Sequence, residues 1–266
     1  MIIQAAERKL FLVSAKDVHI FQPIWEEDIM LMIVGGHSGD EAIMAGPIAA
    51  KVIREGGACV FVGATNGDGG HPILNRSQYA VQKDKEARGA AEIIGAECEL
   101  WDISSGQLEV RAENVQHLAT LIRRYRPDTV ITHWRNSMHT DHVAAYYITT
   151  KAIRLAANQS FEDGQDVFKV RELYFGDNWE DADGFVPDVY VSILPEDEEK
   201  WLMACNCFEF FRGSFYNFNY RGYYEALHRM RGALAARKAD VGHSGLAVGL
   251  MKAPKTAYDF TSWEDR

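Results

Sequence analysis

Apolar runs of strand length alternate with segments of helical spacing up to about residue 170. Strand-like runs and helical segments follow one another along the chain, with the strands at residues 29–34, 59–62, 98–101 and 128–132 and the helices at residues 40–55, 77–94, 112–125 and 141–157. This alternation favours an α/β fold, a mostly parallel sheet with helices on both faces. Pro47 falls inside the first helical segment, so we expect that helix to start late or to bend there.

The pattern weakens beyond residue 160. Strands are expected at residues 172–175 and 189–193, on either side of an acidic loop, and aromatic-rich helices at residues 196–211 and 223–239. The tail, residues 242–266, shows no strong period. Because we find no internal repeat, low-complexity tract or linker, we expect residues 1–266 to form a single domain.

The charge balance argues against nucleic acid as a partner. The chain has 28 Lys and Arg against 38 Asp and Glu, which gives a formal net charge of −10, and it has no basic stripe. No apolar run reaches the roughly 18 residues of a membrane span, and the N-terminus lacks a basic region followed by an apolar stretch. We therefore expect a cytoplasmic protein whose four cysteines stay free thiols.

Two loops that follow predicted strands carry the residues with the most distinctive chemistry. His37 and Asp40 lie after the first strand, and His139 and His142 lie after the fourth. In an open parallel sheet, ligands bind outside the carboxyl ends of the strands, so both loops are expected to face one cleft. His37, Asp40 and one of the two later histidines make a set of two imidazoles and one carboxylate, which is typical of catalytic zinc. The alternative is that these polar residues only cap helices.

A nucleotide-binding site is a less favoured reading of the same glycine-containing loop. A dinucleotide fingerprint needs Gly-x-Gly-x-x-Gly and an acidic residue at the end of the second strand. Here that strand runs into Val62-Gly63-Ala64-Thr65, which offers no carboxylate to a ribose.

The two loops together resemble those of the PIG-L/LmbE-like family of metal-dependent N-acetylglucosaminyl deacetylases. That family carries His-Pro-Asp-Asp-Glu after its first strand and His-Pro-Asp-His after a later one, where this chain has His-Ser-Gly-Asp-Glu at residues 37–41 and His-Thr-Asp-His at residues 139–142. The loop at residues 65–69 and the pair Arg231-Gly232 are similar to further family segments. The resemblance covers about residues 28–235 and implies a Rossmann-like fold, Zn²⁺ (or Fe²⁺ or another divalent metal) and a sugar-linked acetamide as substrate.

The resemblance also implies roles for individual residues. By position, His37, Asp40 and His142 would bind the metal. His139 would protonate or stabilise the tetrahedral intermediate as an imidazolium, and Asp141 would orient His139.

One position departs from the family pattern. The family's general-base Asp corresponds to Gly39, which has no side chain. Asp68, in the loop after the second strand, is the first candidate for a replacement base, and Asp102 is the next. We also expect that Gly39→Asp would raise deacetylase activity by restoring the base.

The expected function is metal-dependent de-N-acetylation of a small amino-sugar conjugate, in which Arg135 and Asn136 are candidates for binding substrate. The alternative is a catalytically weak relative that binds the metal and a glycoconjugate without efficient turnover, which the glycine at position 39 would explain. The aromatic residues between positions 208 and 218 are expected in the core or in the interface of a homo-oligomer.

Overall fold

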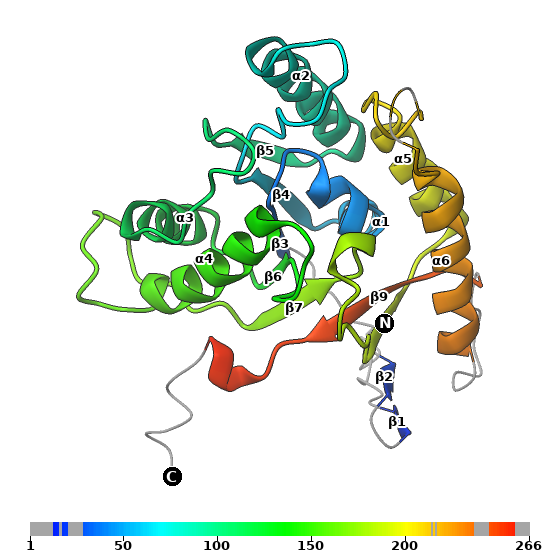
Figure 1. The fold of residues 1–266 in the computed structure, drawn as a ribbon. Coiled ribbons are helices and arrows are strands. Elements are labelled where there is room, and N and C mark those ends of the chain that lie inside the picture. Colours follow the sequence, from blue (N-terminus) through cyan, green and yellow to red (C-terminus); the bar gives the residue numbers. More distant parts are fainter. Residues whose placement is uncertain are drawn as a thin grey trace, which may run out of the picture.

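One mixed sheet forms the centre of the computed structural model, which describes residues 13–15, 18–20, 29–213, 215, 217–236 and 245–258. Within these residues the sheet has nine strands in the order β1-β2-β8-β9-β7-β6-β3-β4-β5 (Figure 1). Five neighbouring strands are parallel: β7 (Glu172–Gly176), β6 (Thr129–Thr132), β3 (Met30–Gly35), β4 (Ala58–Gly63) and β5 (Glu97–Leu100). The expected mostly parallel α/β fold is therefore confirmed.

The remaining strands extend the sheet beyond β7. β9 (Ala247–Lys252) lies antiparallel between β7 and β8 (Val189–Ser192). The short strands β1 (Val13–Ala15) and β2 (Val18–Ile20) complete this edge. The sequence pattern predicts neither β9 nor these two strands. Residues 237–244 and 259–266, which include part of the predicted irregular tail, lie outside the described residues.

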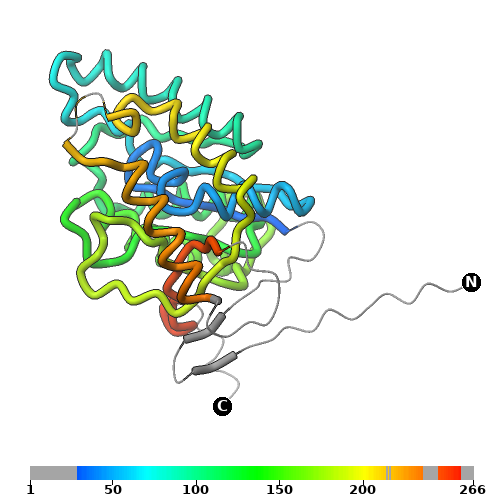
Figure 2. Tube along the Cα trace, turned by 90° about the vertical axis from the view of Figure 1, so that its right-hand side faces the viewer, coloured from blue at the N-terminus to red at the C-terminus, as the bar shows by residue number. Residues whose placement is uncertain are grey.

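Helices cover both faces because side chains on the central strand point alternately to opposite sides. On β3, Leu31 and Ile33 pack with α1 (Asp40–Arg54), α2 (Arg76–Ile94), α5 (Pro195–Cys205) and α6 (Tyr220–Ala236). Met32 and Val34 face the other side, where α3 (Ala112–Tyr125) and α4 (Thr140–Ala156) pack. Figures 1 and 2 show α5 and α6 side by side on their face of the sheet.

The structure tests two predicted helix boundaries. α1 begins at Asp40 and contains Pro47, so the helix does not start late. α5 ends at Cys205, six residues before the predicted end at residue 211, and the chain then turns through Cys207 and Phe208 to α6. No described helix is long and apolar enough to cross a membrane.

The strand order fixes where the chemistry lies. The chain moves from β3 to β4 on one side and later returns to place β6 on the other side of β3. Such a reversal opens a crevice at the carboxyl ends of the two central strands. The loops that follow β3 and β6 meet there, and the backbone N–H of Gly36 lies 2.9 Å from Nε2 of His133.

Candidate metal centre

Three ligand atoms form a nearly equilateral triangle at this crevice. Nδ1 of His37 lies 3.1 Å from Oδ2 of Asp40 and 3.1 Å from Nε2 of His142, and the third edge, from His142 to Asp40, is 3.2 Å. Tetrahedral zinc, with metal–ligand bonds of about 2.0–2.1 Å, places its ligand atoms about 3.3 Å apart. The two imidazoles and the carboxylate therefore fit the divalent metal that the sequence predicts.

The ionisation of Asp40 also favours the binding of a cation at this triangle. Burial opposes the ionisation of Asp40, but the imidazoles of His142 and His37 outweigh it and hold the pKa of that carboxyl well below its usual range. Asp40 is thus an anion, and its Oδ2 also accepts a hydrogen bond from the backbone N–H of His37, 2.8 Å away. A fixed carboxylate beside two imidazole nitrogens is a suitable donor set for Zn²⁺ or Fe²⁺.

Each histidine of the triangle is held by a carboxylate at its other ring nitrogen. Nε2 of His37 lies 3.1 Å from Oδ2 of Asp141, and Nδ1 of His142 lies 2.9 Å from Oδ1 of Asp181. Carboxylates in this position fix the tautomer and the ring orientation of metal-binding histidines. They leave Nδ1 of His37 and Nε2 of His142 facing the triangle.

Asp181 and His133 belong to this centre although the sequence analysis does not select them. Both side chains are fully buried, and Oδ2 of Asp181 lies 2.7 Å from Nδ1 of His133. Nε2 of His133 lies 3.2 Å from Oδ2 of Asp40, so His133 with Asp40 and His142 also meets the spacing of a ligand group. Asp181 therefore holds the rings of both His133 and His142 by hydrogen bonds, and these rings stack with their centroids 3.8 Å apart.

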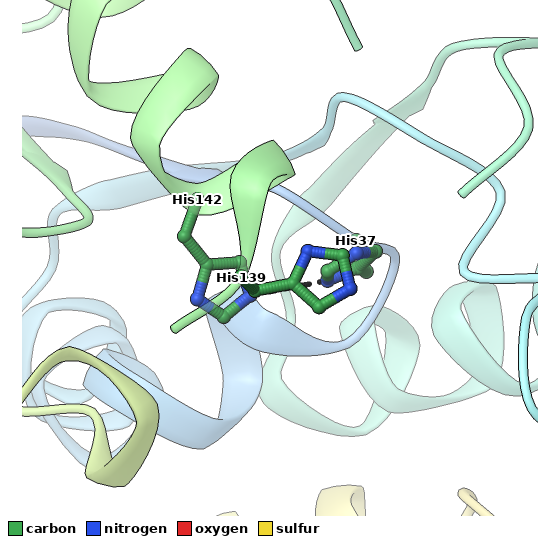
Figure 3. A group of neighbouring side chains, drawn as sticks. All are labelled: His37, His139 and His142. Atoms are coloured by element: carbon green, nitrogen blue, oxygen red, sulfur yellow. Dashed lines mark hydrogen bonds between the residues drawn. The ribbon is translucent and has the colours of Figure 1, made fainter. Parts of the chain in front are cut away.

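His139 lies beside His37 and His142 (Figure 3), and the ligand atoms of these three histidines lie within 4.8 Å of one another. Its Nδ1 accepts a hydrogen bond of 3.2 Å from the backbone N–H of Asp141. This bond favours the neutral ring, with its proton on Nε2. Burial and then the neighbouring His37 and His142 lower the pKa of His139 to about 4, in the same direction. An imidazolium, which the family role implies, is therefore disfavoured.

Asp141 holds a different histidine from the one expected. Its carboxylate lies 4.0 Å from Nδ1 of His139 but bonds His37, and it also accepts hydrogen bonds from the backbone N–H groups of Gly106 and Leu108 at 2.6 and 3.2 Å. The side chain of Asp141 thus orients a metal ligand, while its backbone orients His139.

A cavity of about 560 Å³ opens next to these residues, and this volume suits a small-molecule ligand. His37, Asp40 and His139 line one part of it. The lining also includes five aromatic side chains and three further charged ones, namely Tyr79, Trp179, Phe210, Phe218, Tyr220, Lys83, Arg76 and Glu180.

Glu180 brings a carboxylate to the ligand triangle from the loop after β7. Its Oε2 lies 3.7 Å from Nε2 of His142, and its side chain is 23% exposed. Burial raises the pKa of this carboxyl above its usual value, against the opposing effect of His142. Glu180 is thus an acidic group that contacts both the cavity and the metal ligands.

The three other predicted site residues lie apart from the cavity lining. Asp68 accepts hydrogen bonds from Ser104 Oγ (2.6 Å) and from the backbone N–H of Ser105 (2.7 Å), so both of its oxygens are occupied. Arg135 is exposed and covers the ring of Trp134, and Asn136 bonds the backbone of Asp183.

Gly39, which stands at the position of the family's general base, has φ of +114°. A Cβ atom there would lie 3.0 Å from the ring of Phe208 and 3.3 Å from Nζ of Lys83. The backbone N–H of Gly39 donates a 2.8 Å hydrogen bond to Glu41, whose other carboxyl oxygen has no hydrogen-bond partner among the residues that the structure describes. Burial and then the neighbouring Asp40 raise the pKa of Glu41 to about 7. The ammonium group of Lys83 therefore lies next to the position at which the family pattern has its general base.

Comparisons with known proteins agree with the chemistry of this centre. Residues 32–153, which include both ligand loops, match the family model described as PIG-L, GlcNAc-PI de-N-acetylase. A 4-oxalmesaconate hydratase of Pseudomonas putida KT2440 is 25% identical over 185 residues, which cover 66% of this chain and 71% of that protein. A 1D-myo-inositol 2-acetamido-2-deoxy-alpha-D-glucopyranoside deacetylase of Geodermatophilus obscurus is 25% identical over 178 residues, covering 54% of this chain and 60% of that protein.

Solved structures show the same fold. The crystal structure of GalB, the 4-carboxy-2-hydroxymuconate hydratase of Pseudomonas putida KT2440, superposes with a TM-score of 0.76 at 22% identity and covers 85% of this chain and 96% of that one. The matched segment carries the His37–Glu41 and His139–His142 loops, and the architecture is shared along most of both chains. Over residues 32–153 the chain is therefore similar to the PIG-L family, and its relatives include deacetylases and a hydratase.

Proposed function

We propose that this protein is a metal-dependent amidohydrolase that removes the acetyl group from an N-acetylglucosamine-type amino sugar or its conjugate. The observation that carries the proposal is the triangle of His37, Asp40 and His142 at the edge of a cavity that His139 also lines. A divalent ion held there would polarise the acyl carbonyl and lower the pKa of water towards about 7. The deacetylase relative from Geodermatophilus obscurus supports this reaction class.

His139 supplies a hydrogen-bond donor at the reacting carbonyl. Because its Nδ1 accepts from the backbone, Nε2 carries the proton of the neutral ring. His139 lines the cavity, and this N–H group is suited to stabilise the oxygen that gains negative charge as the amide carbon becomes tetrahedral.

Glu180 takes the role of general base in this proposal. Its carboxylate lines the cavity beside His142 and forms no hydrogen bond within the described part of the chain, whereas both oxygens of Asp68 are bonded. A base at this place removes a proton from the attacking water and then passes it to the departing amine. The products are acetate and the free amino sugar.

Aromatic side chains supply a surface for the sugar ring. Trp179 and Phe218 stack with ring centroids 4.4 Å apart, and both line the cavity with Phe210 and Tyr220. Flat apolar faces of this kind pack against the C–H faces of a pyranose, while the ligand triangle faces the acetamide.

Hydration of an unsaturated carboxylic acid is the second candidate function. It is favoured by the ammonium of Lys83 beside Gly39, where the deacetylase pattern has an Asp. A cation at this place would suit a carboxylate substrate, and the relative from Pseudomonas putida is a hydratase. The same ligand set would then prepare water for addition to a carbon–carbon double bond.

Measurement of acetate release distinguishes the proposed deacetylase function from the hydratase function. Protein loaded with one equivalent of Zn²⁺ is incubated with N-acetylglucosamine and its glycosides, and acetate is quantified by an enzyme-coupled assay, with chelator-treated protein as the control. We expect release that depends on the metal. Binding of the sugars without acetate release would contradict the proposal and indicate a weak relative, and hydration of an unsaturated dicarboxylate by the same sample would favour the second function.

A further inference from the structure

We propose that Lys83 binds an anionic group of the substrate beside the metal ligands, so that the site selects a substrate that carries a carboxylate or a phosphate. This inference rests on the proposed function, because it concerns the same cavity. It adds a recognition residue and a charge to the substrate, which the family match does not specify.

Lys83 is a buried cation without an anionic partner. Its side chain is 3% exposed and lines the cavity, yet it forms no hydrogen bond or salt bridge with any residue that the structure describes. Its Nζ lies 4.7 and 4.5 Å from the ring centroids of Phe208 and Phe210. Contacts with aromatic faces offset only part of the cost of removing an ammonium group from water. An anion delivered by the ligand would supply the missing partner.

The surrounding carboxylates do not fill this role. Glu86, Asp40 and Glu41 all act on Lys83 through their charge, and Glu86 and Glu41 are buried, but no carboxylate of the described residues comes within salt-bridge distance of its Nζ. The oxygens of Glu41 and Glu86 that lack hydrogen bonds are fully enclosed. An anion that pairs with the ammonium group of Lys83 can therefore be accommodated only in the cavity.

Two glycines give Lys83 its position next to the metal loop. A Cβ on Gly67 would lie 2.8 Å from Cε of Lys83, and one on Gly39 would lie 3.3 Å from its Nζ. The ammonium group therefore passes between the glycine-rich loop after β4 and the loop that carries His37 and Asp40. An anion bound to Lys83 would lie close to the reacting part of the substrate.

Arg76 adds a second positive charge to the same cavity. Its Nη1 donates hydrogen bonds to Ser104 Oγ and to the backbone oxygen of Ser105 at 2.7 and 3.0 Å and lies 3.4 Å from Oδ1 of Asp68, and its side chain is 59% exposed. Arg76 is thus fixed at the outer part of the lining, where it attracts an anion without being buried with it. Lys83, which is buried and has no anionic partner among the described residues, is the residue that binds the anion.

Calorimetric titration of Zn²⁺-loaded protein with two anions, inorganic phosphate and malonate, tests the proposal. The titrations compare wild type with Lys83→Met, with Lys83→Gln as a second neutral variant in case the first fails to fold. Lys85→Met, which removes an exposed lysine from the same helix, is the matched control. We expect at least one anion to bind wild type and Lys85→Met roughly 10- to 100-fold more tightly than the Lys83 variants, as for the loss of a hydrogen bond to a charged group. The anion that binds more tightly indicates whether the substrate carries a carboxylate or a phosphate.

Equal affinities in all variants would overturn the proposal, because the metal alone would then hold the anion. The same conclusion would follow if neither anion bound wild type. These titrations need no turnover, so a Lys83-dependent anion site in a protein that releases no acetate would refute the deacetylase function alone. If both proposals hold, N-acetylmuramic acid or N-acetylglucosamine 6-phosphate should be deacetylated with a kcat/KM at least about tenfold above that of N-acetylglucosamine.

Discussion

Nζ of Lys83 lies 3.3 Å from the point where a Cβ atom on Gly39 would stand. The deacetylase pattern has a carboxylate at this position, and this chain has a cation next to it. The φ angle of +114° at Gly39 and the ring of Phe208, 3.0 Å from the same point, leave no relaxed arrangement for a side chain.

Gly39→Asp is therefore expected to lower activity, although the sequence alone predicts a gain. The new carboxylate would be strained, at a cost of about 1–3 kcal/mol, and would pair with Lys83. Urea unfolding and acetate release of the variant check both effects, and Gly39→Ala measures the backbone strain alone. A tenfold gain in kcat at unchanged stability would show that our reading of this position is wrong.

Glu180→Gln should retain the metal and lose about 10²–10⁴-fold in kcat, because the amide keeps the shape of the side chain but cannot accept the proton of water. Steady-state acetate release and metal content measure the two properties. Asp68→Asn is the comparison that decides between the two candidate bases. If Asp68→Asn loses the activity and Glu180→Gln does not, the role belongs to Asp68, as the sequence suggested.

His139→Ala should also retain the metal, and its rate should fall about 10²–10³-fold because the donor to the developing oxyanion is gone. The control is His117→Ala, since His117 is an exposed histidine that stacks on Trp101. Kinetics are measured together with the bound metal. Loss of metal from His139→Ala would instead make His139 a ligand, in the group that it forms with His37 and His142.

Asp181→Asn should weaken metal binding about 10- to 100-fold, because Asp181 fixes the ring of His142 and braces His133. Competition with a chromophoric chelator gives the Kd. Asp183→Asn is the matched control, since Asp183 is an exposed aspartate of the same loop. An unchanged Kd in Asp181→Asn would mean that the triangle is rigid without this carboxylate.

The central part of the fold could be read from the sequence because its signals are local. Four of the five parallel strands contain short apolar runs, the fifth, β5, alternates acidic and apolar residues, and α1 to α4 have regular spacing, so the structure reproduces them within a few residues. β9 could not be read in this way. Gly249 interrupts its apolar pattern, and its place between β7 and β8 depends on residues far away in the chain.

The candidate site also contains some residues that the sequence could identify and others that only the fold places there. Both ligand loops follow strands and carry compact His and Asp patterns, so the sequence could pair them. Asp181 gives no such signal, since it is one of several acids in its loop and only the fold places it behind His142. Lys83 did leave a signal, because it falls on the buried face of α2 with Tyr79 and Ala87, where a charged residue is unusual.

The metal content of the purified protein tests the central claim most directly. We expect elemental analysis after mild dialysis to find about one equivalent of a divalent metal per chain in wild type, and His142→Ala to lose it while His117→Ala keeps it. Protein that is purified without metal and also fails to bind added Zn²⁺ would contradict the assignment of His37, Asp40 and His142 as its ligands.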